Sequence, residues 1–147
     1  MALLRHVGLL VKDIDRSLRL YQDVFNFIPK VDQIESDEFF HHLVGIENSS
    51  ARTVKCYSSM DDSCLELIQY ITPSMLERSK SINALGFNHI AINVIDMEQV
   101  CSSLSSLGLE FLSKPMINTS KTVIVGFCRD FEGNLLELVE TLDVSDG

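Results

Sequence analysis

The sequence predicts an α+β fold made of two successive βαβββ modules within a single domain of residues 1–147. Two observations predict this fold: the chain repeats its own pattern at an offset of 83 residues, and each copy changes from strand-like to helix-like hydrophobic spacing. The modules are expected at residues 1–70 and 87–142, with a linker at 71–86 and a tail at 143–147. Strand–helix–strand alternation alone would also suit a small α/β sandwich, so the duplication is what makes the prediction specific.

The first strand and the helix of each module follow from the repeat. Residues 5–15 align with residues 88–98, so that His6 falls on His89. Each copy continues into a stretch with apolar residues every three to four positions, at 14–24 and 97–107, which is the pattern of a helix packed on a sheet. We expect an aspartate, Asp13 in one module and Asp96 in the other, to cap each helix at its N-terminus.

The remaining strands lie between each helix and the end of its module. Strand candidates occupy residues 30–34 and 53–58 in the first module, and 110–112 and 122–128 in the second. Each module ends in a short apolar strand that one glutamate interrupts. A turn precedes this strand in both copies. The linker holds a proline and a short helix-like stretch at 75–79.

The interrupting glutamates suggest a metal site. In a strand, alternate side chains face opposite sides, so Glu66 points away from its two leucine neighbours and Glu137 does the same. A buried carboxylate must be paired or bound to a cation. Together with His6 and His89, these residues form a set of four ligands that suits one divalent ion of Zn, Ni, Co, Mn or Fe. A single histidine or glutamate on a strand is more often structural, and it is the matched pairs that favour a site.

Other metal-ligating residue types have simpler interpretations. His41 and His42 have no counterpart in the second module and are expected in a loop or at a pocket rim. The four cysteines form no CxxC pair, and in a reducing compartment they are expected to be small buried apolar residues.

Composition excludes several classes of partner. The net charge of −9 and the absence of a visible basic stripe make nucleic acid and anionic membrane poor partners. No apolar run approaches the roughly 20 residues of a membrane span, and no secretory signal is visible, so a cytoplasmic location is expected. A local basic pocket can still exist within an acidic chain.

The two end motifs resemble the vicinal oxygen chelate superfamily, which includes glyoxalase I, methylmalonyl-CoA epimerase, extradiol dioxygenases and the fosfomycin and bleomycin resistance proteins. His6-Val7-Gly8-Leu9, followed by Asp13 and the Arg16–Tyr21 stretch, looks like the opening of that family. The closing motif is similar to residues 130–138, with Phe131 where the family usually has proline. Asn26 replaces the usual glycine at the end of the first helix and can adopt the same left-handed conformation.

The resemblance implies sheets that curl into a metal-holding cleft, with ligands at His6, Glu66, His89 and Glu137. It also implies proton transfer next to a carbonyl through a metal-stabilised enediolate, by an isomerase, an epimerase or a glyoxalase-type lyase. Glu137 is the first choice for the base and Glu66 the second. The substrate is expected to be a small molecule with vicinal oxygens, and the protein a homodimer.

Three features of this resemblance leave alternatives open. Leu10 and Tyr70 stand where glutathione-dependent bacterial glyoxalases carry arginine and asparagine, which argues against a glutathione conjugate. The strand at 53–58 lacks the second glutamate of the epimerases. The alternatives are an Fe(II) dioxygenase, which normally has only three protein ligands, and a metal-free protein that sequesters a small molecule or antibiotic.

Overall fold

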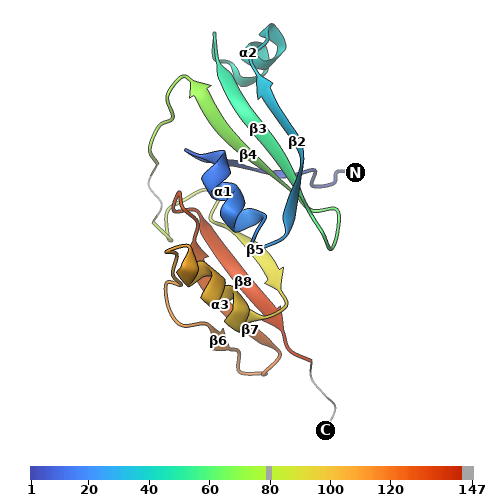
Figure 1. Cartoon of the computed structure of the whole chain (residues 1–147), viewed down its shortest axis with the longest axis vertical. Coiled ribbons are helices and arrows are strands. Elements are labelled where there is room, and N and C mark those ends of the chain that lie inside the picture. The colour runs from blue at the N-terminus through green and yellow to red at the C-terminus, as the bar shows by residue number, and fades with distance from the viewer. Residues whose placement is uncertain (79–80, 144–147) are drawn as a thin grey trace. The chain divides into compact units, whose positions relative to one another are not determined.

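The computed structural model describes residues 1–78 and 81–143 (Figure 1). The chain forms two compact units, Met1–Glu77 and Arg78–Gly147. The boundary between them falls within the segment at 71–86 that the sequence predicts as a linker. Of the predicted tail at 143–147, only Asp143 lies within the described residues. The α+β prediction is confirmed, because each unit combines one mixed four-stranded sheet with helix.

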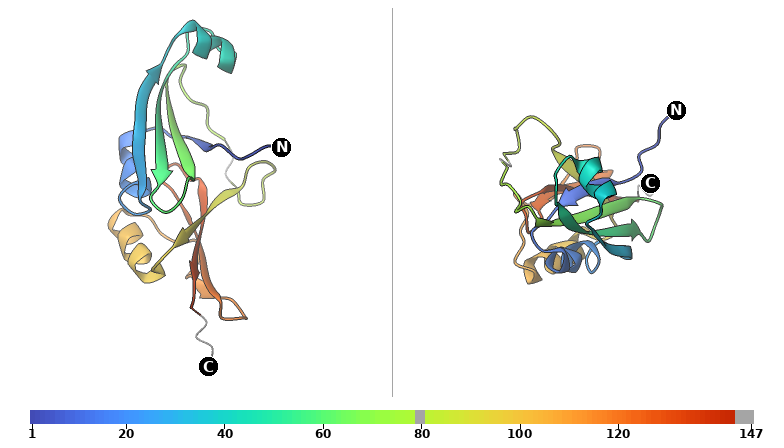
Figure 2. Two further views of the ribbon diagram at one scale, coloured as in Figure 1. Left: turned by 90° about the vertical axis from the view of Figure 1, so that its right-hand side faces the viewer. Right: turned by 90° about the horizontal axis from the view of Figure 1, so that it is seen from above.

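The first unit contains a four-stranded sheet in the order β1-β4-β3-β2. Its elements in chain order are β1 (Val7–Leu10), α1 (Ile14–Tyr21), β2 (Phe27–Glu35), α2 (Glu38–Val44), β3 (Ser50–Ser58) and β4 (Cys64–Thr72). The last strand, β4, pairs in parallel with β1 and antiparallel with β3. Figure 2 shows α1 against one side of this sheet, and α2 at the far end of β2 and β3.

The second unit repeats this arrangement with the order β5-β8-β7-β6. Its elements are β5 (His89–Val94), α3 (Met97–Ser106), β6 (Met116–Ile117), β7 (Val123–Arg129) and β8 (Leu135–Thr141). Again the last strand, β8, is parallel to the first strand, β5, and antiparallel to β7. The second unit has no helix equivalent to α2 within the described residues.

Both helices that cover the sheets begin in the same way. Asp13 accepts a hydrogen bond from the backbone N–H three residues later, and Asp96 does the same, so the predicted N-caps are confirmed. A residue of the last strand also accepts from the first helical N–H of each unit. Gln69 Oε1 lies 3.0 Å from the nitrogen of Ile14, and Glu140 Oε2 lies 2.7 Å from that of Met97. Both units therefore repeat the hydrogen bond by which a side chain of the last strand satisfies the first N–H of the helix.

The core of each unit lies between helix and sheet. On the last strands, the leucines beside each glutamate are almost completely buried. They pack with residues of the covering helix, such as Leu20 and Leu104, which are both fully buried. The fully or nearly fully buried apolar residues include Val11, Ile14, Leu20, Tyr21, Val54, Cys56, Leu67, Leu104, Cys128, Leu136 and Leu138. Burial of this size, at about 25 cal/mol per Å² of apolar surface, is the main force that holds each helix on its sheet.

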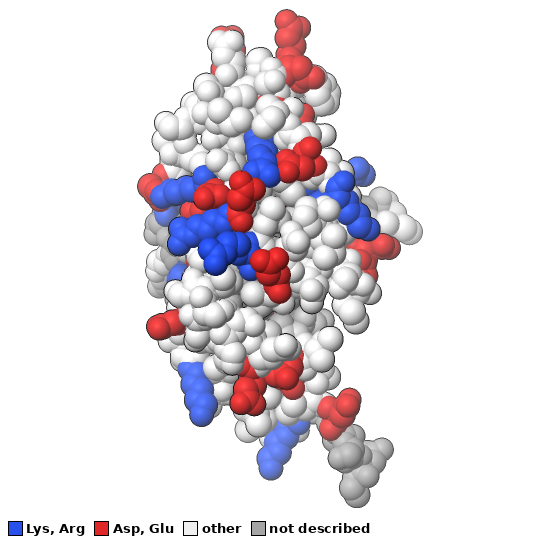
Figure 3. All heavy atoms as spheres, viewed as in Figure 1, with Lys and Arg blue, Asp and Glu red and all other residues white. Residues whose placement is uncertain are grey.

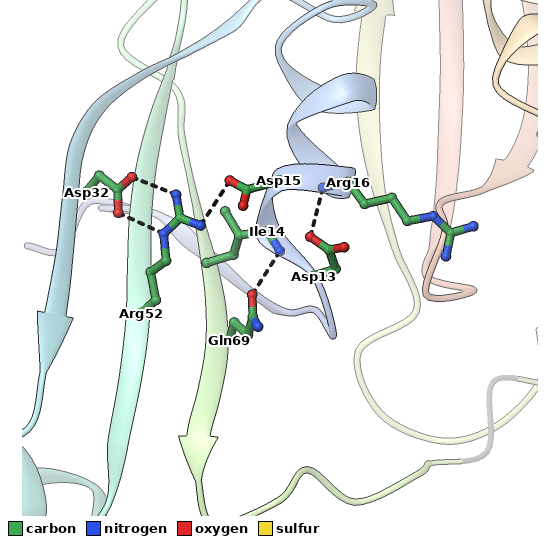
Figure 4. A network of polar contacts seen from close by, with 7 residues as sticks. All are labelled: Asp13, Ile14, Asp15, Arg16, Asp32, Arg52 and Gln69. Atoms are coloured by element: carbon green, nitrogen blue, oxygen red, sulfur yellow. Dashed lines mark hydrogen bonds and ion pairs between the residues drawn. The ribbon is translucent and has the colours of Figure 1, made fainter.

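A charged network reinforces the first unit on its helix-covered side (Figure 4). Arg52 of β3 donates two hydrogen bonds to Asp32 of β2, with distances of 2.9 and 2.7 Å, and a third of 2.9 Å to Asp15 of α1. The hydrogen bonds that Arg52 donates lower the pKa of Asp32, and the same bonds to Asp32 and Asp15 raise the pKa of Arg52. One side chain therefore ties two strands to the helix.

Three expectations about local structure are wrong. His41 and His42 lie in α2, which Asp37 caps at its N-terminus and Gly45 ends with a positive φ, so the loop expectation is wrong for them and their place at a pocket rim stays a prediction. The stretch at 110–112 is no strand, since Phe111 makes a single bridge and β6 comes after Pro115. Residues 75–78 of the helix-like linker stretch are not helical, because so few residues cannot offset the cost of nucleation, and residue 79 lies outside the described residues.

Charged side chains of both signs are mixed on the face seen in Figure 3. Acidic residues outnumber basic ones in the chain by 21 to 12. In residues 1–78 and 81–143 we find no helix with the length and hydropathy needed to cross a membrane.

Candidate metal centre

The first unit brings His6 and Glu66 together. The parallel pairing of β1 with β4 places Gly8 opposite Glu66, so His6, two residues before Gly8, points to the same side of the sheet. His6 Nε2 lies 3.1 Å from Glu66 Oε2. The side chains are 30% and 16% exposed, which leaves them accessible from solvent while most of each is covered.

The second unit contains the same pair in the same place. Here Ala91 is opposite Glu137, and His89 precedes Ala91 by two residues. His89 Nε2 lies 3.3 Å from Glu137 Oε2, with side-chain exposures of 35% and 26%. The histidine ring also packs edge-on against Phe127, with ring centroids 5.5 Å apart. Each histidine–glutamate pair therefore follows from the duplicated strand register.

The glutamates face the side of the sheet that the covering helix leaves free. Leu65 and Leu67 are 3% and 0% exposed, whereas Glu66 between them points to the opposite side. Glu137 has the same position between Leu136 and Leu138, which are fully buried. This confirms the alternation that the sequence predicts.

The geometry of both pairs fits a shared metal ion. Two ligands that each lie about 2.1 Å from one ion are about 3.0 Å apart at a right angle and about 3.4 Å apart in a tetrahedron. The nitrogen–oxygen distances of 3.1 and 3.3 Å fall between these limits. Imidazole nitrogen with carboxylate oxygen is also a donor set that Zn, Ni, Co, Mn and Fe accept. The same distances also suit a hydrogen bond between imidazole and carboxylate. The residues around each pair are therefore needed to distinguish the two interpretations.

Neither unit gathers more than these two ligands. In the described ranges, 1–78 and 81–143, no three or more His, Cys, Asp or Glu side chains form a cluster that could hold a metal ion. His6 with Glu66, and His89 with Glu137, are therefore described as two separate pairs of candidate ligands. Their union around one ion stays a prediction.

The sequence-based interpretation missed a lysine beside the first pair. Lys55 of β3 is directly opposite Glu66 of β4, and its Nζ lies 3.8 Å from Glu66 Oε1. In the second unit the residue opposite Glu137 is Phe127. The signal was present in the sequence, because alternation puts Lys55 on the same side as Glu66 once the register of the hairpin is known.

The cysteines take no part in this site. Burial raises the pKa of Cys56 to about 11 and that of Cys128 to about 12, and it also raises the pKa values of Cys64 and Cys101. A thiol must lose its proton to bind a metal. A raised pKa makes this loss harder, so these side chains are poor metal ligands near pH 7. All four are free, and three are buried, which agrees with their prediction as small apolar residues.

Comparison with known proteins agrees with the fold. The family model described as "Glyoxalase/Bleomycin resistance protein/Dioxygenase superfamily" matches residues 3–138. A lactoylglutathione lyase of Schizosaccharomyces pombe is 29% identical over 92% of this chain, which spans only 46% of that relative. A probable lactoylglutathione lyase of Synechocystis is 27% identical and is covered over 98% of its length.

Solved structures share the fold at lower identity. A glyoxalase family protein from Bacillus cereus is 20% identical with a TM-score of 0.88, and the match covers 97% of both chains. A fosfomycin resistance protein from Listeria monocytogenes is 16% identical with a TM-score of 0.63, over 97% of this chain and 96% of that one. At these identities the likeness concerns the fold.

Proposed function

Because the chain belongs to the Glyoxalase/Bleomycin resistance protein/Dioxygenase superfamily, we propose that it is a metal-dependent enzyme that transfers a proton next to a carbonyl group. The reaction class is an isomerisation, an epimerisation or a glyoxalase-type lyase reaction. His6, Glu66, His89 and Glu137 hold one divalent ion in this proposal. The lactoylglutathione lyases among its relatives support an enzyme of this type.

One observation carries the proposal: both units present a histidine nitrogen and a carboxylate oxygen at the separation of two ligands on one ion, at 3.1 and 3.3 Å. A divalent metal held by these residues would supply Lewis-acid chemistry, by polarising substrate oxygens and offsetting the negative charge that develops when a carbon next to a carbonyl loses its proton. A binding protein without a metal has no need for such pairs at matched positions.

The protein's own residues divide the remaining work. Glu137 takes the proton from the substrate carbon and returns it to a neighbouring carbon or to the other face, and Glu66 is the second candidate for this role. Two differences in their surroundings favour Glu137. Phe127 packs edge-on against His89 of the second pair, while Lys55 Nζ lies 3.8 Å from Glu66 Oε1 of the first.

The substrate is a small molecule with neighbouring oxygens, and two side chains argue against a glutathione conjugate. Leu10 is 51% exposed where the glutathione-dependent enzymes carry arginine, and it offers no hydrogen-bond donor. Tyr70 stands in place of their asparagine and packs against Phe40 of α2, with ring centroids 6.3 Å apart.

We also propose that the active protein is a homodimer, in which the four ligands come either from one chain or from two. Mixing inactive His6→Gln and His89→Gln proteins distinguishes these arrangements. If the sites are built across two chains, an equal mixture regains up to about a quarter of wild-type activity, because about half of the dimers are heterodimers and one of the two shared sites in each keeps all its ligands. Sites within one chain regain none.

Metal content and proton exchange test the proposal. Protein purified without chelator should contain close to one equivalent of a divalent ion, measured by inductively coupled plasma mass spectrometry. A panel of α-hydroxy carbonyls and thiohemiacetals in D2O should show metal-dependent deuterium uptake at the α-carbon by NMR. Glu137→Gln should abolish this exchange and keep the circular dichroism spectrum. Exchange that survives EDTA, or a fully active Glu137→Gln variant, would refute the mechanism.

Sequestration without a metal is the second candidate, because one observation favours it. Lys55 and His6 already provide Glu66 with two partners in the absence of an ion. Calorimetric titration with fosfomycin in the presence of EDTA tests this candidate directly. Tight binding by metal-free protein, without turnover in the exchange assay, would replace the enzymatic proposal.

A further inference from the structure

Asn88, which directly precedes β5, connects the loop before it to the imidazole of His89. Its Nδ2 donates a hydrogen bond of 2.7 Å to the backbone carbonyl of Ile82. Its Oδ1 lies 2.7 Å from His89 Nδ1. A backbone carbonyl can only accept, so the amide nitrogen must face Ile82 and the amide oxygen must face the ring. The orientation of the amide, which is often ambiguous, is therefore fixed by its other partner.

This orientation determines which ring nitrogen carries the proton. The amide oxygen is an acceptor only, so His89 Nδ1 must be the donor. In the neutral imidazole Nε2 then has no hydrogen and presents its lone pair. That lone pair faces Glu137 Oε2 at 3.3 Å. Two acceptors at this distance repel each other unless a cation lies between them, so the hydrogen-bond interpretation does not suit the neutral second pair.

The first pair lacks this arrangement. The residue before His6 is Arg5, whose guanidinium can only donate. Among the described residues we find no hydrogen-bond partner for His6 Nδ1. His6 can therefore keep its proton on Nε2 and donate it to Glu66, at 3.1 Å. The two histidines occupy the same position of the repeat and differ in how their protons are held.

We infer that Asn88 is a positioning residue, which holds the proton of His89 on Nδ1 so that Nε2 is ready to bind the metal. The inference rests on the proposed function as far as the metal is concerned. Histidines that bind metals usually donate their second N–H to such a partner, and its loss costs about 10–100-fold in affinity. Because the Asn88 side chain is exposed, the lower end of that range, about tenfold, applies here.

The position of the ring proton can be measured without any metal. Long-range ¹H–¹⁵N spectra of the labelled apo protein at about pH 8.5, where an ordinary imidazole is neutral, distinguish the two ring protonation patterns. His89 should carry its proton on Nδ1, and Asn88→Ala should remove this bias. Asn88→Asp keeps an acceptor at the same place and should restore it. Asn83→Ala is the matched control, since this amide of the same loop contacts Ser81 and not the ring.

Cobalt affinity, measured by calorimetry on the same variants, completes the test. Asn88→Ala should weaken binding about tenfold, and Asn83→Ala should leave it unchanged. The inference is overturned if Asn88→Ala leaves the His89 proton on Nδ1, or shifts it without any change in affinity. If wild-type protein binds no cobalt while His89 keeps its proton on Nδ1, the proposed function fails and the role of Asn88 in fixing the ring proton stands.

Discussion

The two units repeat one strand register and surround it with different neighbours. In the first, Lys55 lies 3.8 Å from Glu66, and the residue before the histidine is Arg5. In the second, Phe127 packs edge-on against the histidine ring, and Asn88 contacts its Nδ1. The first pair therefore has a cationic lysine beside its glutamate, whereas the second pair has an aromatic ring and an amide beside its histidine.

The two units therefore share the strand register, while the side chains around each histidine–glutamate pair differ. The parallel pairing of first and last strands brings a histidine to a glutamate in both units, whatever the neighbouring side chains are. In our proposal, the metal affinity of each pair depends on the residue before the histidine and on the residue opposite the glutamate in the adjacent strand. We expect the second pair to contribute more to affinity, since it loses fewer protein contacts when an ion binds.

The largest effect should come from the histidines themselves. Loss of a ligand costs more than loss of its outer partner, so His89→Gln should weaken cobalt binding by more than about 100-fold. His6→Gln should weaken cobalt binding less, by about tenfold. The reason is that Glu66 must give up its contact with Lys55 when an ion binds, so the first pair contributes less affinity. Calorimetric titration of both variants measures the ratio. Equal losses, or a larger loss for His6→Gln, would break the proposed difference between the units.

Arg52 should give the next largest effect, on stability and only in the first unit. The side chains of its partners Asp32 and Asp15 are 51% and 76% exposed, which reduces the free energy by which the network stabilises the fold. Arg52→Met should lower the free energy of unfolding by about 1–2 kcal/mol, measured by urea denaturation at pH 7. Arg52→Lys, which restores the charge without the planar fork, should recover only part of this loss.

The same network predicts a pH dependence. The pKa of Asp32 is lowered in the folded protein, so this carboxyl contributes stability above its unfolded pKa of about 3.9 and loses it as the pH falls below that value. Urea denaturation between about pH 6 and pH 3 should therefore show a steeper loss for wild type than for Arg52→Met. Parallel curves for the two proteins would show that the ion pairs contribute nothing.

A smaller effect should follow from exchanging the residues opposite the glutamates. Lys55→Met removes a cation beside Glu66 and should strengthen cobalt binding about fivefold, and Phe127→Lys should weaken it by a similar factor. The effect of Lys55→Met should shrink at high salt, because Lys55 is partly exposed. Weaker binding by Lys55→Met would instead show that Lys55 helps to hold Glu66 in place for the ion.

The smallest effect concerns the matched contacts at the helix N-termini. Gln69 in the first unit and Glu140 in the second accept from the first helical N–H, but only Glu140 carries charge. Negative charge at a helix N-terminus stabilises by about 0.3–1 kcal/mol, so Gln69→Glu should stabilise and Glu140→Gln should destabilise by about 0.5 kcal/mol. Thermal unfolding at low ionic strength measures both, and changes of the same sign would contradict this account.

Much of the fold was predictable because the signals were local and present twice. The N-caps Asp13 and Asp96 and the alternation around Glu66 and Glu137 need only a few neighbouring residues, and the structure confirms them. Asn26 does adopt the predicted left-handed conformation, with a φ of 57°.

The errors and omissions come from contacts that a single segment does not contain. The helix α2 has its own caps, yet its apolar residues do not form a clear stripe, and only Phe40 is buried. Lys55 and Asn88 become part of the site through the strand pairing and the loop carbonyl of Ile82. A common ion for the two pairs stays a prediction, because residue patterns do not specify how two units are arranged.

The β1–β4 pairing has a consequence for engineering new specificity. His6 and Glu66 belong to strands that are adjacent in the sheet, while the segment at residues 36–49, which contains α2, connects the two strands on the far side, β2 and β3. Changes in the length or composition of that segment leave the β1–β4 hydrogen bonds untouched. It still reaches the side of the sheet that carries Glu66, since Phe40 contacts Tyr70 there. Combinatorial libraries restricted to these residues can therefore change the surface around Tyr70 while the histidine and glutamate stay in register.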